Sequence, residues 1–263
     1  MSTLTALQVV AYAVASALFL GFFLGLRIRG AQLGRVALAI AVVLQFADIG
    51  VRCSHLHNPL SSTSDAIAFV SWMIAAGYLG VSFRYRVPAA GAFVVPVATV
   101  LLVLARVAPA AKGSAPPSLL GHAHVFLATA GVAAFALAAM LAVLYLLEER
   151  QLKHRQFGRL LVRGTPLETL DRLASRCVSL GFPIFTAAII TGAYWIARLG
   201  VLVDASSMRS AHGLAIVTWV AFGILVVART TAGWQGRRAA WLTLCGFGGA
   251  LLVLALYHLN RAG

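Results

Sequence analysis

The sequence has few charged residues, and most of those present are basic. Only 11% of the 263 residues are charged, against about 25% in soluble domains. Seven residues are acidic and 21 are basic, and only two of the basic residues are lysines. So little charge excludes an ordinary soluble enzyme, whose surface would need far more.

Cysteine is scarce as well. Cys53, Cys177 and Cys245 lie far apart and form no CxxC pair, which excludes a disulfide framework and a thiolate zinc site. The residues from Met1 to Thr5 lack the basic start and cleavage site of a removable signal peptide. We therefore expect the first hydrophobic run to remain as a membrane span.

Hydrophobic residues make up 61% of the chain and fall into eight long apolar runs. One helical crossing of a bilayer needs roughly 20 apolar residues, and lipid offers no partner to an open sheet edge. The runs lie at about 5–26, 34–51, 65–83, 88–107, 121–147, 176–198, 211–228 and 239–258. The sequence thus predicts an all-α, polytopic membrane bundle of about eight transmembrane helices, with residues 1–263 as a single transmembrane domain.

The basic residues indicate the orientation of this bundle. Fifteen of the 21 lie in one set of alternate loops, and six lie in the other set. Because basic residues accumulate in cytoplasmic loops, we expect the first set to face the cytoplasm and both termini to be extracytoplasmic. The positive charge is therefore interpreted as a topology signal in a bacterial-type cytoplasmic membrane, and no nucleic-acid partner is expected.

The longest predicted cytoplasmic loop contains a helix signal. The segment from Thr165 to Glu168 has the Thr, Pro and Glu of a capping box with proline at the first helical position. Leu167, Leu170 and Leu173 then share one helix face. We expect an amphipathic helix over about 165–176 on the cytoplasmic surface, leading into the sixth span.

Six of the seven histidines lie at or near the predicted outer ends of spans. They are His55, His57, His122, His124, His212 and His258. An imidazole at this level can ligate iron or relay protons, or it can simply cap a helix end at the interface. His122 and His124 are two positions apart and point about 200° from each other on a helix, so at most one is expected to face inward.

Two other features have both a structural and a functional interpretation. Asp48 lies four residues before Arg52, a spacing that favours an ion pair on one helix face over a proton relay. Trp195 is expected near a span end, where it belongs either to an interfacial aromatic belt or to a platform for a flat ligand such as a porphyrin.

Several blocks of the sequence follow one another in a recognisable order between residues 50 and 257. They are His57 to Ser61 followed by Asp65, Phe69, Ser71 and Trp72; His124-Val125; Pro166 to Leu173; Leu180 to Pro183; Thr191 to Trp195; and Gly233 to Arg238. In this order the blocks resemble the CcsA/ResC family of cytochrome c assembly proteins. The size and short C-terminus are most similar to the HemX-like branch.

This resemblance implies a membrane protein of cytochrome c biogenesis that binds or presents haem at the outer face of the cytoplasmic membrane. His124 matches the outer haem-ligating histidine that precedes a valine. His57, His212 or His258 would supply the second iron ligand, and His57 is the first choice among them. Trp195 would contact the haem ring.

The haem propionates would be paired by Arg52, Arg198 or Arg209, because a guanidinium matches a carboxylate bidentately. The expected partners are the lipid bilayer, other cytochrome c assembly proteins and apocytochrome c. We expect no catalytic residue in this chain and a role as an accessory to haem attachment rather than as an enzyme by itself.

The segment between Trp195 and Trp219 lacks the tryptophans of the family's haem-handling branch. This departure raises an alternative, a regulatory or scaffolding membrane protein of tetrapyrrole or cytochrome assembly that does not handle haem. A small-solute transporter is less favoured, because apart from Pro96 and Pro183 the spans contain few interruptions.

Overall fold

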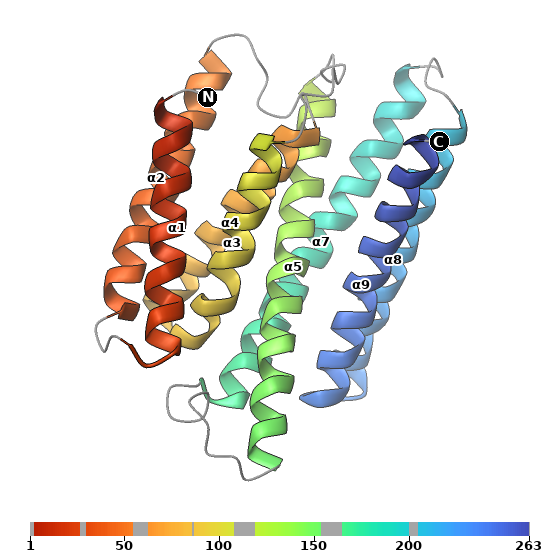
Figure 1. The fold of residues 1–263 in the computed structure, drawn as a ribbon. Coiled ribbons are helices and arrows are strands. Elements are labelled where there is room, and N and C mark those ends of the chain that lie inside the picture. The colour runs from red at the N-terminus through yellow and green to blue at the C-terminus, as the bar shows by residue number, and fades with distance from the viewer. Residues whose placement is uncertain are drawn as a thin grey trace. The chain divides into compact units, whose positions relative to one another are not determined.

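The structure is a computed structural model that describes residues 3–26, 30–54, 63–85, 87–107, 119–153, 165–199 and 205–262. For residues 205–212 and 250–262 it describes the backbone only. All regular elements of this described part are α-helices (Figure 1). They are α1 (Thr3–Phe23), α2 (Gly30–Ser54), α3 (Thr63–Arg84), α4 (Pro88–Val107), α5 (Leu119–Lys153), α7 (Leu167–Leu199), α8 (Ala205–Thr231) and α9 (Arg237–Ala262).

Seven of the eight predicted apolar runs each fall within one of these helices, and the first, 5–26, extends three residues beyond the end of α1 at Phe23. Six of them, α1 to α5 and α7, are long and apolar enough to cross a membrane by length and composition. The seventh predicted run lies on α8, whose described apolar stretch is Ala215–Thr231, and the eighth lies on α9. The all-helical membrane architecture is confirmed, while the number of spans and the outward termini remain predictions.

The chain forms two compact units, which are described separately. The first, unit 1, comprises Met1–Pro117 and Leu147–Thr169, and the second, unit 2, comprises Ser118–Leu146 and Leu170–Gly263. Unit 1 holds α1 to α4, and unit 2 holds α8, α9 and most of α5 and α7.

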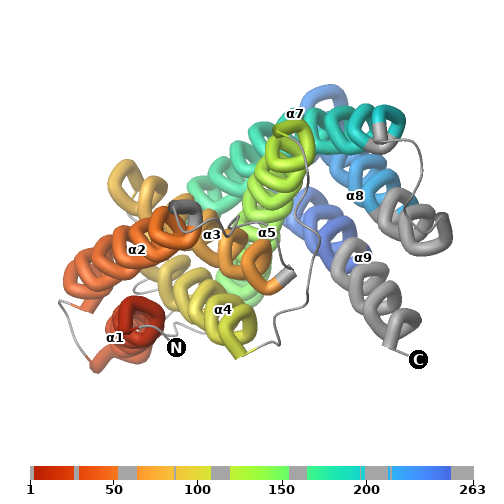
Figure 2. Tube along the Cα trace, turned by 90° about the horizontal axis from the view of Figure 1, so that it is seen from above, coloured from red at the N-terminus to blue at the C-terminus, as the bar shows by residue number. Residues whose placement is uncertain are grey.

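In unit 1, α1 and α3 each pack against both α2 and α4 (Figure 2). The Phe19 ring of α1 meets the Tyr78 ring of α3 edge-on, with centroids 5.7 Å apart. Polar side chains also join the helices, as where the Ser71 hydroxyl of α3 donates to the Ala98 carbonyl of α4 at 2.7 Å. Such bonds stabilise helix pairs in lipid, where apolar burial alone drives little association.

In unit 2, aromatic rings of three helices form the core. The Phe135 ring of α5 stacks on the Phe222 ring of α8, with ring centroids 3.6 Å apart. It meets the Phe185 ring of α7 edge-on, with centroids 5.5 Å apart. Gly131 lies against Phe185 so closely that an added Cβ would come within 2.9 Å of the Phe185 Cβ. The small residues that follow His124 therefore allow close helix contact.

Of the residues predicted as an amphipathic helix over 165–176, those from Leu167 onward form the first turns of α7, which continues without a break into the sixth predicted span. Leu170 and Leu173 are buried, at 0% and 3% exposure. The predicted apolar face thus packs inside the protein.

The prediction that the Thr165 side chain caps this helix is wrong. The Thr165 hydroxyl is buried and has no hydrogen-bond partner among the described residues. Instead the Thr165 backbone N–H donates to the Glu148 carboxylate at 3.2 Å, and the first turn is closed by the Thr169 N–H and the Pro166 carbonyl at 2.8 Å. A long-range acceptor from α5 has replaced the local cap.

Candidate functional site

The His124 ring extends from α5 to the backbone of α7 within unit 2. Its Nδ1 lies 2.7 Å from the Ala188 carbonyl oxygen. A carbonyl can only accept, so Nδ1 carries the hydrogen and donates it. In the neutral ring this leaves Nε2 with a free lone pair, which is the state that a metal requires.

A glycine makes this approach of the two helices possible. A Cβ added at Gly192 would lie 2.6 Å from Cε1 of His124 and 2.8 Å from Nδ1. These distances are well below the usual 3.5 to about 4 Å separation of non-bonded carbon atoms. A larger residue at position 192 would therefore push the imidazole away from the Ala188 carbonyl.

Trp195 lies beside His124 of α5, on the face of α7 that carries Ala188 and Gly192. Residues 188, 192 and 195 are four and three positions apart, so they line one face of the helix. The Trp195 and His124 ring centroids are 6.2 Å apart, with the planes tilted by 33°. The indole Nε1 is buried and has no hydrogen-bond partner among the described residues. A buried N–H of this kind is costly unless a ligand or water accepts from it.

Arg198 follows Trp195 by one turn, at the end of α7. Its Nε donates to the Tyr194 hydroxyl at 2.8 Å, and its guanidinium carbon lies 5.2 Å from the Tyr194 ring centroid. A guanidinium has five N–H donors. Arg198 is exposed, and its two terminal nitrogens can therefore bind an anion.

Together these groups fit a flat, anionic molecule with a metal at its centre. The imidazole would offer a nitrogen to the metal, the indole would offer a buried donor, and the guanidinium would offer a counter-charge for carboxylates. The described residues contain no group of three His, Cys, Asp or Glu side chains that could hold a bare metal ion. A haem iron makes no such demand, because the porphyrin supplies four of its ligands and the protein supplies only the axial ones.

The structure brings together only part of the predicted site. His124 and Trp195 lie at the contact between α5 and α7, and the exposed Arg198 follows Trp195 by three residues on α7. His57 lies outside the described residues. The side chains of His212 and Arg209 on α8, and of His258 on α9, also lie outside them, so the roles predicted for these four residues remain predictions.

Arg52 lies in unit 1, where it belongs to a cluster of four charges. Asp48 accepts from Arg52 Nε at 3.0 Å and from Arg106 at 2.7 Å, and Asp65 lies 3.8 and 4.0 Å from the same two arginines. The predicted Asp48–Arg52 pair is confirmed. Arg52 already pairs with two carboxylates, which it shares with Arg106, and its predicted role toward a propionate stays a prediction.

Sequence reasoning missed three members of these sites. Gly192 and the Ala188 carbonyl were not singled out, because a contact between helices depends on how they pack. Arg106 was counted only as an outer charge, although its side chain is 9% exposed and its partner Asp48 is 4% exposed. A lone acid near the end of an apolar span was the available signal, since such a group needs a counter-charge.

Comparison with known proteins gives a consistent assignment. The family described as "Cytochrome C assembly protein" matches residues 60–261. The cytochrome c biogenesis protein CcsA of Trieres chinensis is 25% identical over 255 residues, covering 82% of this chain and 80% of that protein. The CcsA of Guillardia theta is 26% identical over 213 residues, covering 72% of this chain and 69% of that protein.

A third relative matches more strongly over a shorter stretch. The CcsA of Gloeobacter violaceus is 40% identical over 90 residues, which is 34% of this chain but only 26% of that protein. No solved structure matches the chain. The comparisons do not separate the HemX-like branch from the rest of the family, so that part of the resemblance stays a prediction.

Proposed function

We propose that this chain, which belongs to the cytochrome c assembly protein family, binds haem at the outer face of the membrane and presents it for attachment to apocytochrome c. The observation that carries the proposal is the His124 imidazole. Its Nδ1–H is committed to the Ala188 carbonyl at 2.7 Å, so Nε2 is the nitrogen left for iron.

Each group on α5 and α7 has a distinct role in this proposal. His124 Nε2 would ligate the iron, and the Ala188 carbonyl would keep the ring in the required tautomer and orientation. Trp195 contacts the porphyrin edge and donates its unpaired Nε1–H to a propionate. Arg198 pairs with a propionate through its terminal nitrogens, since guanidinium and carboxylate match bidentately.

The second iron ligand is proposed to be His57, with His212 or His258 as the other candidates from the sequence. Haem is the cargo of this protein, and the covalent bonds that attach it are made to cysteine thiols of an apocytochrome partner. The chain itself is proposed to hold, orient and release haem, alongside other cytochrome c assembly proteins. From the distribution of basic residues over the loops, we propose that this activity lies on the outer side of a bacterial-type cytoplasmic membrane.

Absorption spectroscopy on protein purified from haem-replete cells tests the proposal. We expect a Soret band in the wild type and its loss in His124→Ala. His122→Ala is the matched control, because it removes an imidazole two positions away on the same helix, and it is expected to keep the band. A wild type without a Soret band, or a band unchanged in His124→Ala, would contradict haem binding at this site and favour the regulatory alternative.

A further inference from the structure

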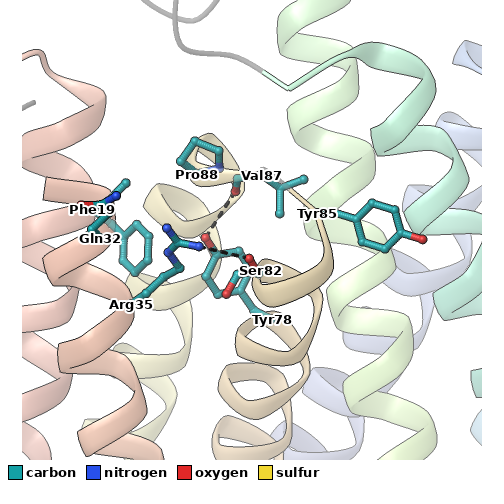
Figure 3. A pocket seen from close by; sticks show the side chains of 9 residues that line it. Phe19, Gln32, Arg35, Tyr78, Ser82, Tyr85, Val87 and Pro88 are labelled. Atoms are coloured by element: carbon teal, nitrogen blue, oxygen red, sulfur yellow. Dashed lines mark hydrogen bonds between the residues drawn. The ribbon is translucent and has the colours of Figure 1, made fainter. Parts of the chain in front are cut away.

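A pocket of about 450 Å³ lies in unit 1, where the starts of α2 and α4 meet the ends of α1 and α3 (Figure 3). Its lining includes Phe19 from α1, Gln32 and Arg35 from α2, and Tyr78 and Ser82 from α3. The basic loops of the sequence predict that this end of the helices faces the cytoplasm. The haem proposal makes no use of this pocket.

The pocket contains a cation that lacks a carboxylate partner. The half-buried Arg35 extends from α2 toward α3, and its Nη1 donates to the Ser82 carbonyl at 3.3 Å (Figure 3). Among the described residues no acid forms an ion pair with Arg35; the described acids form ion pairs with Arg52, Arg106, Lys153 and Arg229. Most of the five N–H donors of Arg35 are therefore left for a ligand.

The wall beside Arg35 is preorganised. Tyr78 is 1% exposed, and its hydroxyl donates to the Val87 carbonyl at 3.3 Å. Gly91 allows this packing, because a Cβ at that position would collide with both the Tyr78 hydroxyl and the Phe19 ring. A fully buried Phe19 completes the wall. A ligand thus meets a cavity that is already formed.

The surface of α2 next to the pocket suits a hydrocarbon chain. Leu33, Val36 and Ile40 are 50%, 59% and 53% exposed. Their spacing of three and four residues places them on one face of the helix. An amphiphile with its head beside Arg35 can therefore lay an acyl chain along α2.

We propose that this pocket binds the phosphate group of an anionic phospholipid, with Arg35 as the principal contact. A guanidinium binds phosphate oxygens through two parallel hydrogen bonds. Anionic lipids are enriched in the cytoplasmic leaflet, and basic pockets between transmembrane helices recognise their headgroups. The apolar track along α2 selects a lipid over a free phosphate ion.

Native mass spectrometry of the delipidated full chain in detergent tests this proposal. We expect one phosphatidylglycerol to bind with at least about tenfold preference over phosphatidylcholine, and Arg35→Gln to weaken that binding about tenfold. Arg150→Gln is the matched control, because Arg150 is exposed at the same predicted end and its loss changes the net charge equally. This control is expected to bind as the wild type does.

Two further measurements complete the test. Gln32→Trp adds bulk at an exposed lining residue and leaves Arg35 in place; it is expected to block the lipid even if Arg35→Gln folds poorly. Inorganic phosphate at millimolar concentration is expected not to displace phosphatidylglycerol. Equal binding of the two lipids, unchanged binding in Arg35→Gln and Gln32→Trp, or displacement by phosphate alone would each overturn the proposal.

Discussion

Replacing Gly192 with alanine adds one methyl group at the point where the His124 ring meets α7. The added Cβ would lie 2.6 Å from Cε1 of the imidazole, so the ring must move by about 0.8 Å to reach ordinary van der Waals contact. The hydrogen bond from Nδ1 to the Ala188 carbonyl is 2.7 Å long. A shift of that size takes it beyond the length of a normal N–H to oxygen bond.

The expected consequence is weaker haem binding. Crowding of a packed site costs about 1 to 3 kcal/mol, and loss of a hydrogen bond that orients a metal ligand lowers affinity about 10- to 100-fold. We therefore predict that Gly192→Ala binds haem at least about tenfold more weakly than the wild type. Titration of the haem-free protein with hemin, followed at the Soret band, measures this change.

Gly248→Ala is the matched control for this substitution. Gly248 lies within α9 in the same unit, and a Cβ added there would have no neighbour within 4 Å. Both variants gain the same helix-favouring methyl group, so a difference between them isolates the contact with His124. Equal haem affinity in Gly192→Ala, Gly248→Ala and the wild type would refute the reasoning, because the imidazole would then not depend on close contact with α7.

Two other predictions concern the remaining parts of the structure. Trp195→Phe keeps an aromatic ring but removes the unpaired Nε1–H; we expect haem affinity to fall severalfold with the Soret maximum unchanged, and a shifted maximum would argue against this role. Asp48→Asn removes the carboxylate that faces the buried Arg106, and we expect about 3 to 5 kcal/mol less stability toward thermal unfolding in detergent. Glu149→Gln, at the more exposed pair with Lys153, should cost under about 1 kcal/mol, and similar losses in the two variants would contradict the importance of burial.

Hydropathy was sufficient to locate the helices but not their ends. The fifth run was predicted to end near residue 147, whereas α5 continues to Lys153. Lys153 pairs with Glu149 at 2.7 Å across one turn, a spacing that supports an exposed helix. Likewise α7 begins at Leu167, nine residues before the predicted sixth span, and the helix predicted over about 165–176 came from Thr165, Pro166 and Glu168 and the leucine spacing, not from hydropathy. Hydropathy detects the part of a helix that lipid can cover. It does not detect the polar turns by which the helix extends beyond that part.

Some residues of the candidate site could be identified from the sequence around them, and others depend on contacts between distant parts of the chain. The resemblance singled out His124, and the apolar context singled out Asp48, because each can be recognised from its neighbours in sequence. The Ala188 carbonyl and Gly192 contact the ring of His124, which lies 64 and 68 positions earlier in the chain. Arg106 pairs with Asp48, which lies 58 positions earlier. Such contacts are set by the rotation and depth at which helices pack, which one sequence does not specify.

The central claim is that His124 Nε2 ligates the iron of a bound haem. The most direct test is the absorption spectrum of His124→Gly, purified from haem-replete cells and supplied with free imidazole. We predict that the variant lacks the wild-type Soret band and that imidazole restores it, because the small ligand fills the space of the missing ring. A variant that shows the wild-type band without imidazole would contradict the claim.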